Sequence, residues 1–201
     1  MSSAAAPTRL DDSALDLLFR EARSHKAWRA EPVPRALLLQ VMALAQAGPT
    51  ATNSQPMRIV FVESPQGKER LRAALHAGNV AKMMSAPVTA IVAYDLDFHT
   101  HQARTFPHRD VGSGYRADPA HALDTALRNS TLQGAYLMLA ARAMGLDTGP
   151  MSGFHTDKVD AEFFAGTALR SNFLCNLGYG DPGDLLPRQP RLGFDEVCSW
   201  A

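Results

Sequence analysis

Three short motifs in the sequence are of types that carry chemistry, but none has the surrounding sequence that its chemistry requires. Residues 178–183 (Gly-Tyr-Gly-Asp-Pro-Gly) match the GxGxxG pattern of dinucleotide-binding loops. That pattern needs a helix to begin at the glycines, whereas Pro182 and the Leu-Leu-Pro that follows prevent a long helix, so we expect a turn. His99 and His101 alternate as a metal pair would, but no suitable third ligand is close, so we expect no metal site. Ser152 misses the GxSxG nucleophile motif by its register.

Five groups of polar residues remain, each at the end of a predicted element. Asn79 and Lys82 lie three residues apart, so they share one face of a helix. Each group taken alone also suits an ordinary helix terminus or turn. Only their combination is informative. The groups are 23–26 (RSHK), 49–56 (PTATNSQP), 79–82 (NVAK), 149–153 (GPMSG) and 188–191 (RQPR).

The hydrophobic pattern predicts several helices and about three strands. Apolar residues at helical spacing predict helices at 11–24, 34–47, 66–75, 80–85 and 158–164. β-Branched and aromatic runs predict strands at 58–63, 87–94 and 172–179. Few strands between long helices indicate an α+β or α/β domain, and the irregular alternation argues against a doubly wound parallel sheet.

Two segments differ from the rest of the chain. Residues 98–118 contain proline, glycine and three of the seven histidines, with little periodicity. We predict a long loop there, and loops of that length are often lids over a site. Residues 120–144 have apolar side chains on nearly every side of a predicted helix. Such a helix is buried all round, in a core or at a subunit interface.

Length and composition exclude several classes of protein. The chain has 201 residues, and we expect a flexible N-terminus at 1–9 followed by one domain at 10–201. Its 20 basic and 20 acidic side chains cancel, which argues against a nucleic-acid or anionic-membrane partner. No apolar stretch reaches the ~20 residues of a membrane helix. Two cysteines do not make a disulfide framework, so we expect a cytoplasmic protein.

Together and in this order, the polar groups and their flanking residues resemble the FMN-dependent nitroreductase family. The likeness runs over about residues 10–197. Within the family it is greatest to a branch of malonic semialdehyde reductases and NAD(P)H nitroreductases. The stretches that carry it are 22–28 (ARSHKAW), 48–62 (GPTATNSQPMRIVFV), 78–95 (GNVAKMMSAPVTAIVAYD), 126–154 (ALRNSTLQGAYLMLAARAMGLDTGPMSGF) and 171–183 (SNFLCNLGYGDPG).

The resemblance implies a fold and an assembly. The fold is an α+β sandwich around an antiparallel central sheet. The assembly is an intertwined homodimer with two FMN sites at the interface. The long predicted helix would then lie in that interface, and a C-terminal segment would cross to the partner.

The resemblance also implies the residues that bind FMN. Cations near both ends of the chain would bind the phosphate, and a polar loop would close the site in part from the other subunit. The chain departs from the family pattern at Ala22 and Gln189, where basic residues often stand, which leaves phosphate binding in question. The implied residues are Arg23, Ser24, His25, Lys26, Thr50, Thr52, Asn53, Gln55, Asn79, Lys82, Pro150, Met151, Ser152, Gly153, Arg188 and Arg191.

In the implied reaction, NADH or NADPH gives a hydride to flavin N5, and a second small molecule is then reduced on the same ring face. The branch suggests malonic semialdehyde as that substrate, reduced to 3-hydroxypropionate. Phe106, His108 and Arg109 are candidates for gripping its carboxylate, with ordinary loop residues as the alternative. A broad nitroaromatic or quinone reductase and a non-catalytic flavin-binding protein remain as alternatives.

Overall fold

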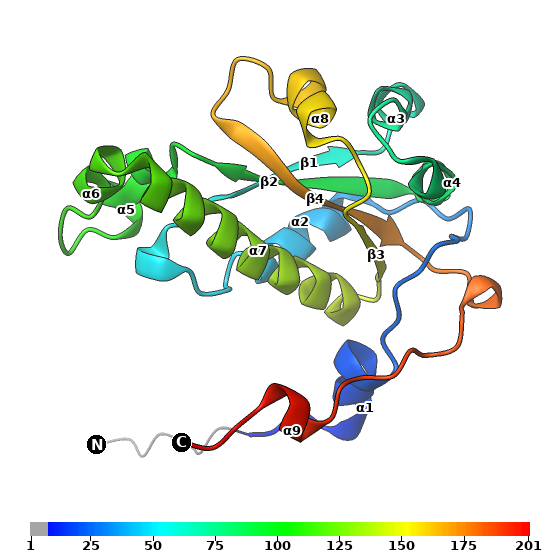
Figure 1. Cartoon of the computed structure of the whole chain (residues 1–201). Coiled ribbons are helices and arrows are strands. Elements are labelled where there is room, and N and C mark those ends of the chain that lie inside the picture. Colours follow the sequence, from blue (N-terminus) through cyan, green and yellow to red (C-terminus); the bar gives the residue numbers. More distant parts are fainter. Residues whose placement is uncertain (1–7) are drawn as a thin grey trace.

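A four-stranded antiparallel sheet forms the centre of the computed structural model, which describes residues 8–201 (Figure 1). The spatial order is β1-β2-β4-β3, so the long strand β4 lies between β2 and β3. The register places Ile91 opposite both Val60 and Leu174, and Pro150 opposite Cys175. This confirms the predicted α+β fold with an antiparallel sheet. The strands are β1 (Met57–Val62), β2 (Val88–Asp95), β3 (Asp147–Met151) and β4 (Leu169–Gly178).

Helices cover both faces of the sheet (Figure 1). The predicted helix at 11–24 is wrong in its extent: it has one α-helical turn, then a π-helical segment that ends at Arg20. The α-helices are α1 (Asp12–Leu15), α2 (Arg35–Ala45), α3 (Pro65–Arg72), α4 (Ala77–Ser85), α5 (Gln102–Thr105), α6 (Gly112–Ala117), α7 (Pro119–Ala143), α8 (Thr156–Phe163) and α9 (Phe194–Val197). The π-helical segment is η1 (Asp16–Arg20), and the 3-10 segments are η2 (Ala51–Asn53), η3 (Phe98–His101) and η4 (Pro182–Asp184).

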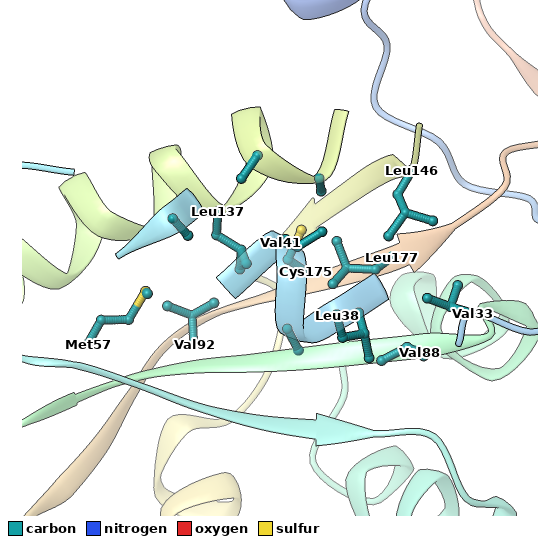
Figure 2. Packing of buried hydrophobic residues seen from close by; sticks show 14 residues of the cluster. Val33, Leu38, Val41, Met57, Val88, Val92, Leu137, Leu146, Cys175 and Leu177 are labelled. Carbon is teal, nitrogen blue, oxygen red and sulfur yellow. The ribbon is translucent and has the colours of Figure 1, made fainter. Parts of the chain in front are cut away.

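Alternation along β2 divides the interior into two cores. Successive strand residues point to opposite faces, so Val88, Ala90 and Val92 pack on one side. There they meet α2 and α7, in the cluster that Figure 2 shows. Ile91 and Ala93 point the other way, toward α3, α4 and α8. The sheet is therefore the middle layer of three.

The long helix α7 buries one side only. Its small residues lie closest to the sheet, and a Cβ on Gly134 would come within 2.5 Å of the Phe173 ring. Four large apolar side chains on the flanks of this buried face remain 40–50% exposed, so burial all round within one chain is wrong. The alternative, an interface with another subunit, stays a prediction. The exposed residues are Leu123, Leu127, Leu132 and Tyr136.

Residues 98–118 are not the long loop that the sequence predicts. They form η3, α5 and α6, with a short connection at 106–111. Phe98 is fully buried, and the rings of Phe98 and Tyr115 meet edge to face at 4.8 Å. Ala122 and Ala126 of α7 complete this third apolar cluster. The segment is thus packed onto the start of α7. The sequence does not reveal these helices, because helices so short show only weak periodicity.

Both ends of the described chain leave the three layers and lie near each other (Figure 1). Residues 186–201 are exposed throughout. Arg23 donates to the carbonyl of Leu186, and Arg188 donates to that of Ala22 at 3.1 Å. Residues 1–7 of the predicted N-terminal segment lie outside the described residues. Within residues 8–201, no helix combines the length and the hydropathy that a membrane crossing requires.

The two cysteines differ sharply in environment, which predicts a difference in reactivity. Burial raises the pKa of the Cys175 thiol to about 12, so almost no thiolate forms near pH 8. Cys198 is exposed. We expect Ellman's reagent to titrate one thiol in the native protein and two in denaturant. Cys198→Ser should abolish the native reaction. A native Cys198→Ser protein that still reacts promptly would contradict the placement of Cys175.

Candidate functional site

Residues 24–29 are attached to the edge of the sheet by backbone hydrogen bonds. Ser24 forms a parallel bridge with Thr148, and the His25 N–H donates to the Thr148 carbonyl at 3.0 Å. Farther along, the Arg29 N–H donates to the carbonyl of Tyr179 at 2.8 Å. The sequence group 23–26 is therefore held beside β3 and the end of β4.

The His25 side chain faces the protein interior at this junction. It is 8% exposed, and its Nε2 lies 3.3 Å from Oδ1 of Asp147. The other oxygen of that carboxylate accepts the Gly180 N–H at 2.8 Å. A Cβ on Gly180 would overlap the imidazole ring, and one on Gly149 would lie 2.5 Å from the His25 carbonyl oxygen. His25 and Asp147 thus fix the position of residues 23–26.

A cavity of about 410 Å³ opens where the N-terminal and C-terminal segments meet. Five cationic side chains line it, and no aspartate or glutamate does. We call it the basic cavity. Such a concentration of one sign of charge suits a multiply charged anion, and guanidinium groups match phosphate best. The cations are Arg23, Lys26, Arg142, Arg188 and Arg191.

A second polar cluster lies where β3 ends against α4. The Asn79 side chain donates to the Gly153 carbonyl at 3.0 Å and accepts from Lys82 Nζ at 3.0 Å. The His76 N–H donates to the same carbonyl at 3.1 Å. Asn176 of β4 donates to the Lys82 carbonyl at 3.1 Å, which ties α4 to the sheet. The structure therefore joins the predicted groups 79–82 and 149–153.

The strand β3 connects the basic cavity with this second cluster. Thr148 pairs with Ser24 beside the cavity, and Gly153 follows five residues later. At about 3.3 Å per residue in a strand, the two places are roughly 16 Å apart. Pro150 and Met151 belong to the strand between them, and Ser152 is exposed just after it. The arrangement suits an elongated ligand that is anionic at one end and has a polar edge at the other.

The predicted loop group 50–55 lies elsewhere in the chain. The Ala51 N–H donates to the Asn129 side chain at 2.8 Å, and the Asn53 side chain donates to the Thr105 carbonyl at 2.7 Å. Asn129 is 13 residues before Arg142 on α7, which is about 20 Å along a helix. Within a single chain, this loop therefore does not reach the basic cavity.

The backbone of this loop is strained. Thr52, Asn53 and Gln55 have φ of 48°, 50° and 44°, in the left-handed region that side chains disfavour. Such strain persists only where the surroundings impose it, and it is concentrated at functional sites. Thr50 contributes to the constraint, because its hydroxyl accepts the Gln55 N–H at 3.2 Å.

The predicted substrate residues lie on the connection between α5 and α6. Phe106 and His108 meet edge to face at 5.5 Å, and Arg109 is exposed. Arg104 of the same segment lines a cavity of about 290 Å³ together with Gln55. The structure thus brings residues 104–109 near the strained loop.

The structure adds residues that the sequence analysis did not single out. Asp147 and Arg142 are ordinary in sequence, since nothing local distinguishes them from other charged residues near a helix end. The turn predicted at 178–183 is confirmed, because β4 ends at Gly178 and only the short η4 follows. His99 and His101 lie in η3. Within residues 8–201, no three His, Cys, Asp or Glu side chains gather as a metal site would require.

Comparison with known proteins places these features in context. A model described as the nitroreductase family matches residues 19–179. A Burkholderia lata protein is 59% identical over 191 residues, which cover 95% of this chain and 98% of that protein. A Stenotrophomonas maltophilia protein is 55% identical over 189 residues, 94% and 96% of the two chains. Both are provisionally named NADH dehydrogenase/NAD(P)H nitroreductase.

Solved structures support the fold. A provisionally named nitroreductase from Exiguobacterium sibiricum, crystallised in complex with FMN, superposes with a TM-score of 0.83. The two sequences are 20% identical, and the match covers 97% of this chain and all of that one. At this identity the likeness establishes the architecture alone.

The contact between Asn79 and Gly153 yields a test of the second cluster. A Cβ at residue 153 would lie 2.5 Å from the Asn79 amide nitrogen, whereas one on Gly78 would meet nothing within 4 Å. We expect Gly153→Ala to lower the free energy of unfolding by about 1–3 kcal/mol, because it displaces a hydrogen-bonded amide. Gly78→Ala, in the helix that carries Asn79, is the control and should be neutral or slightly stabilising. Equal urea midpoints for the two variants would refute the described packing.

Proposed function

The chain belongs to the nitroreductase family, and we propose that it is an FMN-dependent oxidoreductase that takes its electrons from NADH or NADPH. The single observation that carries the proposal is the basic cavity, joined by β3 to the Asn79–Gly153 cluster. The names of relatives that are 55–59% identical support the nicotinamide donor.

The basic cavity fits the phosphate of FMN. A phosphate dianion needs several N–H donors and positive charge, and five cations with no carboxylate supply both. Arg23, Arg188 and Arg191 would hold the phosphate, while Ser24 and Lys26 would bond the ribityl chain. Ala22 and Gln189 also line the cavity, so the two departures from the family pattern occur at the phosphate itself.

The second cluster fits the polar edge of a flavin ring. The Lys82 ammonium uses one of its three N–H donors on Asn79, so two remain for a ligand. Its charge would stabilise the negative charge of a reduced ring. Gly153 has no side chain and allows close approach, and the Ser152 and Gly153 N–H groups would face the ring. When bound, FMN supplies the hydride transfer, and the protein binds and orients it.

The proposed enzyme is an intertwined homodimer. The exposed large apolar side chains of α7 support a subunit interface; they are Leu123, Leu127, Leu132 and Tyr136. Thr50, Thr52, Asn53 and Gln55 would then complete the partner's flavin site, which explains their distance from the basic cavity of their own chain. A part of the exposed C-terminal segment 186–201 would pack on the partner.

We propose malonic semialdehyde as the substrate, reduced to 3-hydroxypropionate with one NAD(P)H and one proton consumed. The carboxylate of this substrate needs a cation, and Arg109 beside Phe106 and His108 is the proposed anchor. Reduction of nitroaromatics or quinones is the second candidate, because the relatives' names include nitroreductase. It needs only a flat apolar slot over the ring.

Flavin content and its reduction test the proposed cofactor. We expect the purified protein to be yellow, or to become yellow with added FMN. NADH or NADPH should bleach the flavin absorbance under anaerobic conditions. Lys82→Met should weaken FMN binding roughly tenfold or more, because a charged donor is lost. A colourless protein that cannot be loaded would refute the proposal, and a loaded protein that neither donor reduces would indicate a non-catalytic flavin-binding protein.

The choice of substrate has a separate test. We expect Arg109→Ala to raise the KM for malonic semialdehyde roughly tenfold or more, since an ionic hydrogen bond to the carboxylate is lost. The KM for menadione, which has no carboxylate, should stay the same. Arg72→Ala, an exposed arginine on α3, is the matched control. An unchanged KM for the semialdehyde would eliminate Arg109 as its anchor, and turnover of nitrofurazone and menadione alone would favour the broad reductase.

A further inference from the structure

Arg142 contributes a cation to the basic cavity from an unexpected element. It belongs to the last turn of α7, whereas the other four cations come from residues 23–26 and 188–191. The end of α7 points toward the N-terminal segment (Figure 1). Arg142 is half-buried, and its Nη1 donates to the Leu18 carbonyl at 3.2 Å. The guanidinium is therefore fixed in direction at the cavity wall.

No carboxylate neutralises Arg142. Among the described residues, none lies within 4.0 Å of its guanidinium, although Arg58 and Arg128 each have such a partner. Burial lowers the pKa of Arg142 because it penalises the charged form, and this effect exceeds the opposing influence of Cys175 and Asp147. Asp147 is itself engaged with His25 and Gly180. A half-buried cation of this kind lacks the counterion that usually accompanies burial.

The position of Arg142 near the C-terminus of α7 does not account for its partial burial and its lack of a counterion. Cations near a helix C-terminus interact well with its dipole, but an exposed side chain suffices for that effect. The Leu18 carbonyl accepts one hydrogen bond, and a guanidinium has five N–H donors. Arg142 therefore presents unused donors and an uncompensated charge to a cavity that contains no acidic group.

We infer that Arg142 is a direct ligand of the FMN phosphate and replaces the cation that is missing at Ala22. This inference rests on the proposed FMN site and extends it to a residue of α7. Ala22 and Gln189 contribute no charge to the cavity wall, and Arg142 lines the same cavity. Its bond to Leu18 also couples phosphate binding to the position of the N-terminal segment.

The test compares FMN with riboflavin, which lacks the phosphate. Arg142→Gln removes the charge but keeps a donor for the Leu18 carbonyl. We expect its Kd for FMN to rise roughly 10- to 100-fold, because an ionic hydrogen bond to the phosphate is lost. Its Kd for riboflavin should stay the same. Quenching of flavin fluorescence measures both constants without any turnover. Arg128→Gln on the same helix, exposed and paired with Asp124, is the control and should change neither constant.

Each result decides the question. Equal losses for FMN and riboflavin would show a merely structural role and overturn the inference, as would an unchanged Kd for FMN. If Arg142→Gln does not fold, Arg142→Lys keeps the charge without the planar fork, and a several-fold loss confined to FMN is expected. If Arg142→Lys instead binds both flavins as tightly as the unmodified protein does, the inference is overturned. If the unmodified protein binds neither flavin, the proposed function itself fails, which is a different outcome from a failure of Arg142 alone.

Discussion

The backbone pairing between residues 24–29 and the β3–β4 edge of the sheet is the constraint on which the candidate site depends. It holds an otherwise irregular segment against β3 and the end of β4. The contact between the buried His25 imidazole and the partly exposed Asp147 carboxylate fixes this junction. Because Arg23 is then fixed beside β3, the C-terminal segment can pack on it through Leu186 and Arg188. The basic cavity exists only as a result of these attachments.

The cavity concentrates charge that the chain as a whole does not have. Formal charges cancel over the 201 residues, yet five cations surround about 410 Å³ with no acidic side chain among them. Like charges brought together raise the free energy of the unliganded chain, and a phosphate dianion would relieve that repulsion. The same arrangement would stabilise the terminal segments when the ligand binds, since ligand binding to the folded state adds to its stability.

The long helix α7 relates the two ends of the molecule. Its first half supports the strained loop through Asn129, and its last turn brings Arg142 to the basic cavity. One face packs on the sheet, whereas leucines on its flanks stay exposed. A single rigid element thus sets the distance between the loop and the cavity. In the proposed dimer that distance is what places the loop of one chain at the flavin of the other.

Much of the fold and some of the site were predictable from local patterns. β-Branched and aromatic runs predicted β1, β2 and β4, and the polar groups at element ends, with their order, indicated the family and its expected site residues. The inferences about strands and turns succeed because side-chain periodicity and turn chemistry depend on neighbours in the chain. By contrast, β3 contains Gly149 and Pro150 and has no strand-like pattern. It is a strand because the edge of β4 supplies the hydrogen bonds, and that edge is distant in sequence.

Tertiary structure alone decided the rest. The burial of His25 against Asp147 and the arrival of Arg142 at the basic cavity both require segments more than a hundred residues apart to meet. Residues 98–118 likewise became helices because Phe98 and Tyr115 found a core at the start of α7. The amino-acid order thus sets which local structures are favourable and which side chains are available. Which charges face one another is set by packing, because electrostatic and hydrophobic interactions act between residues that only the folded chain brings together.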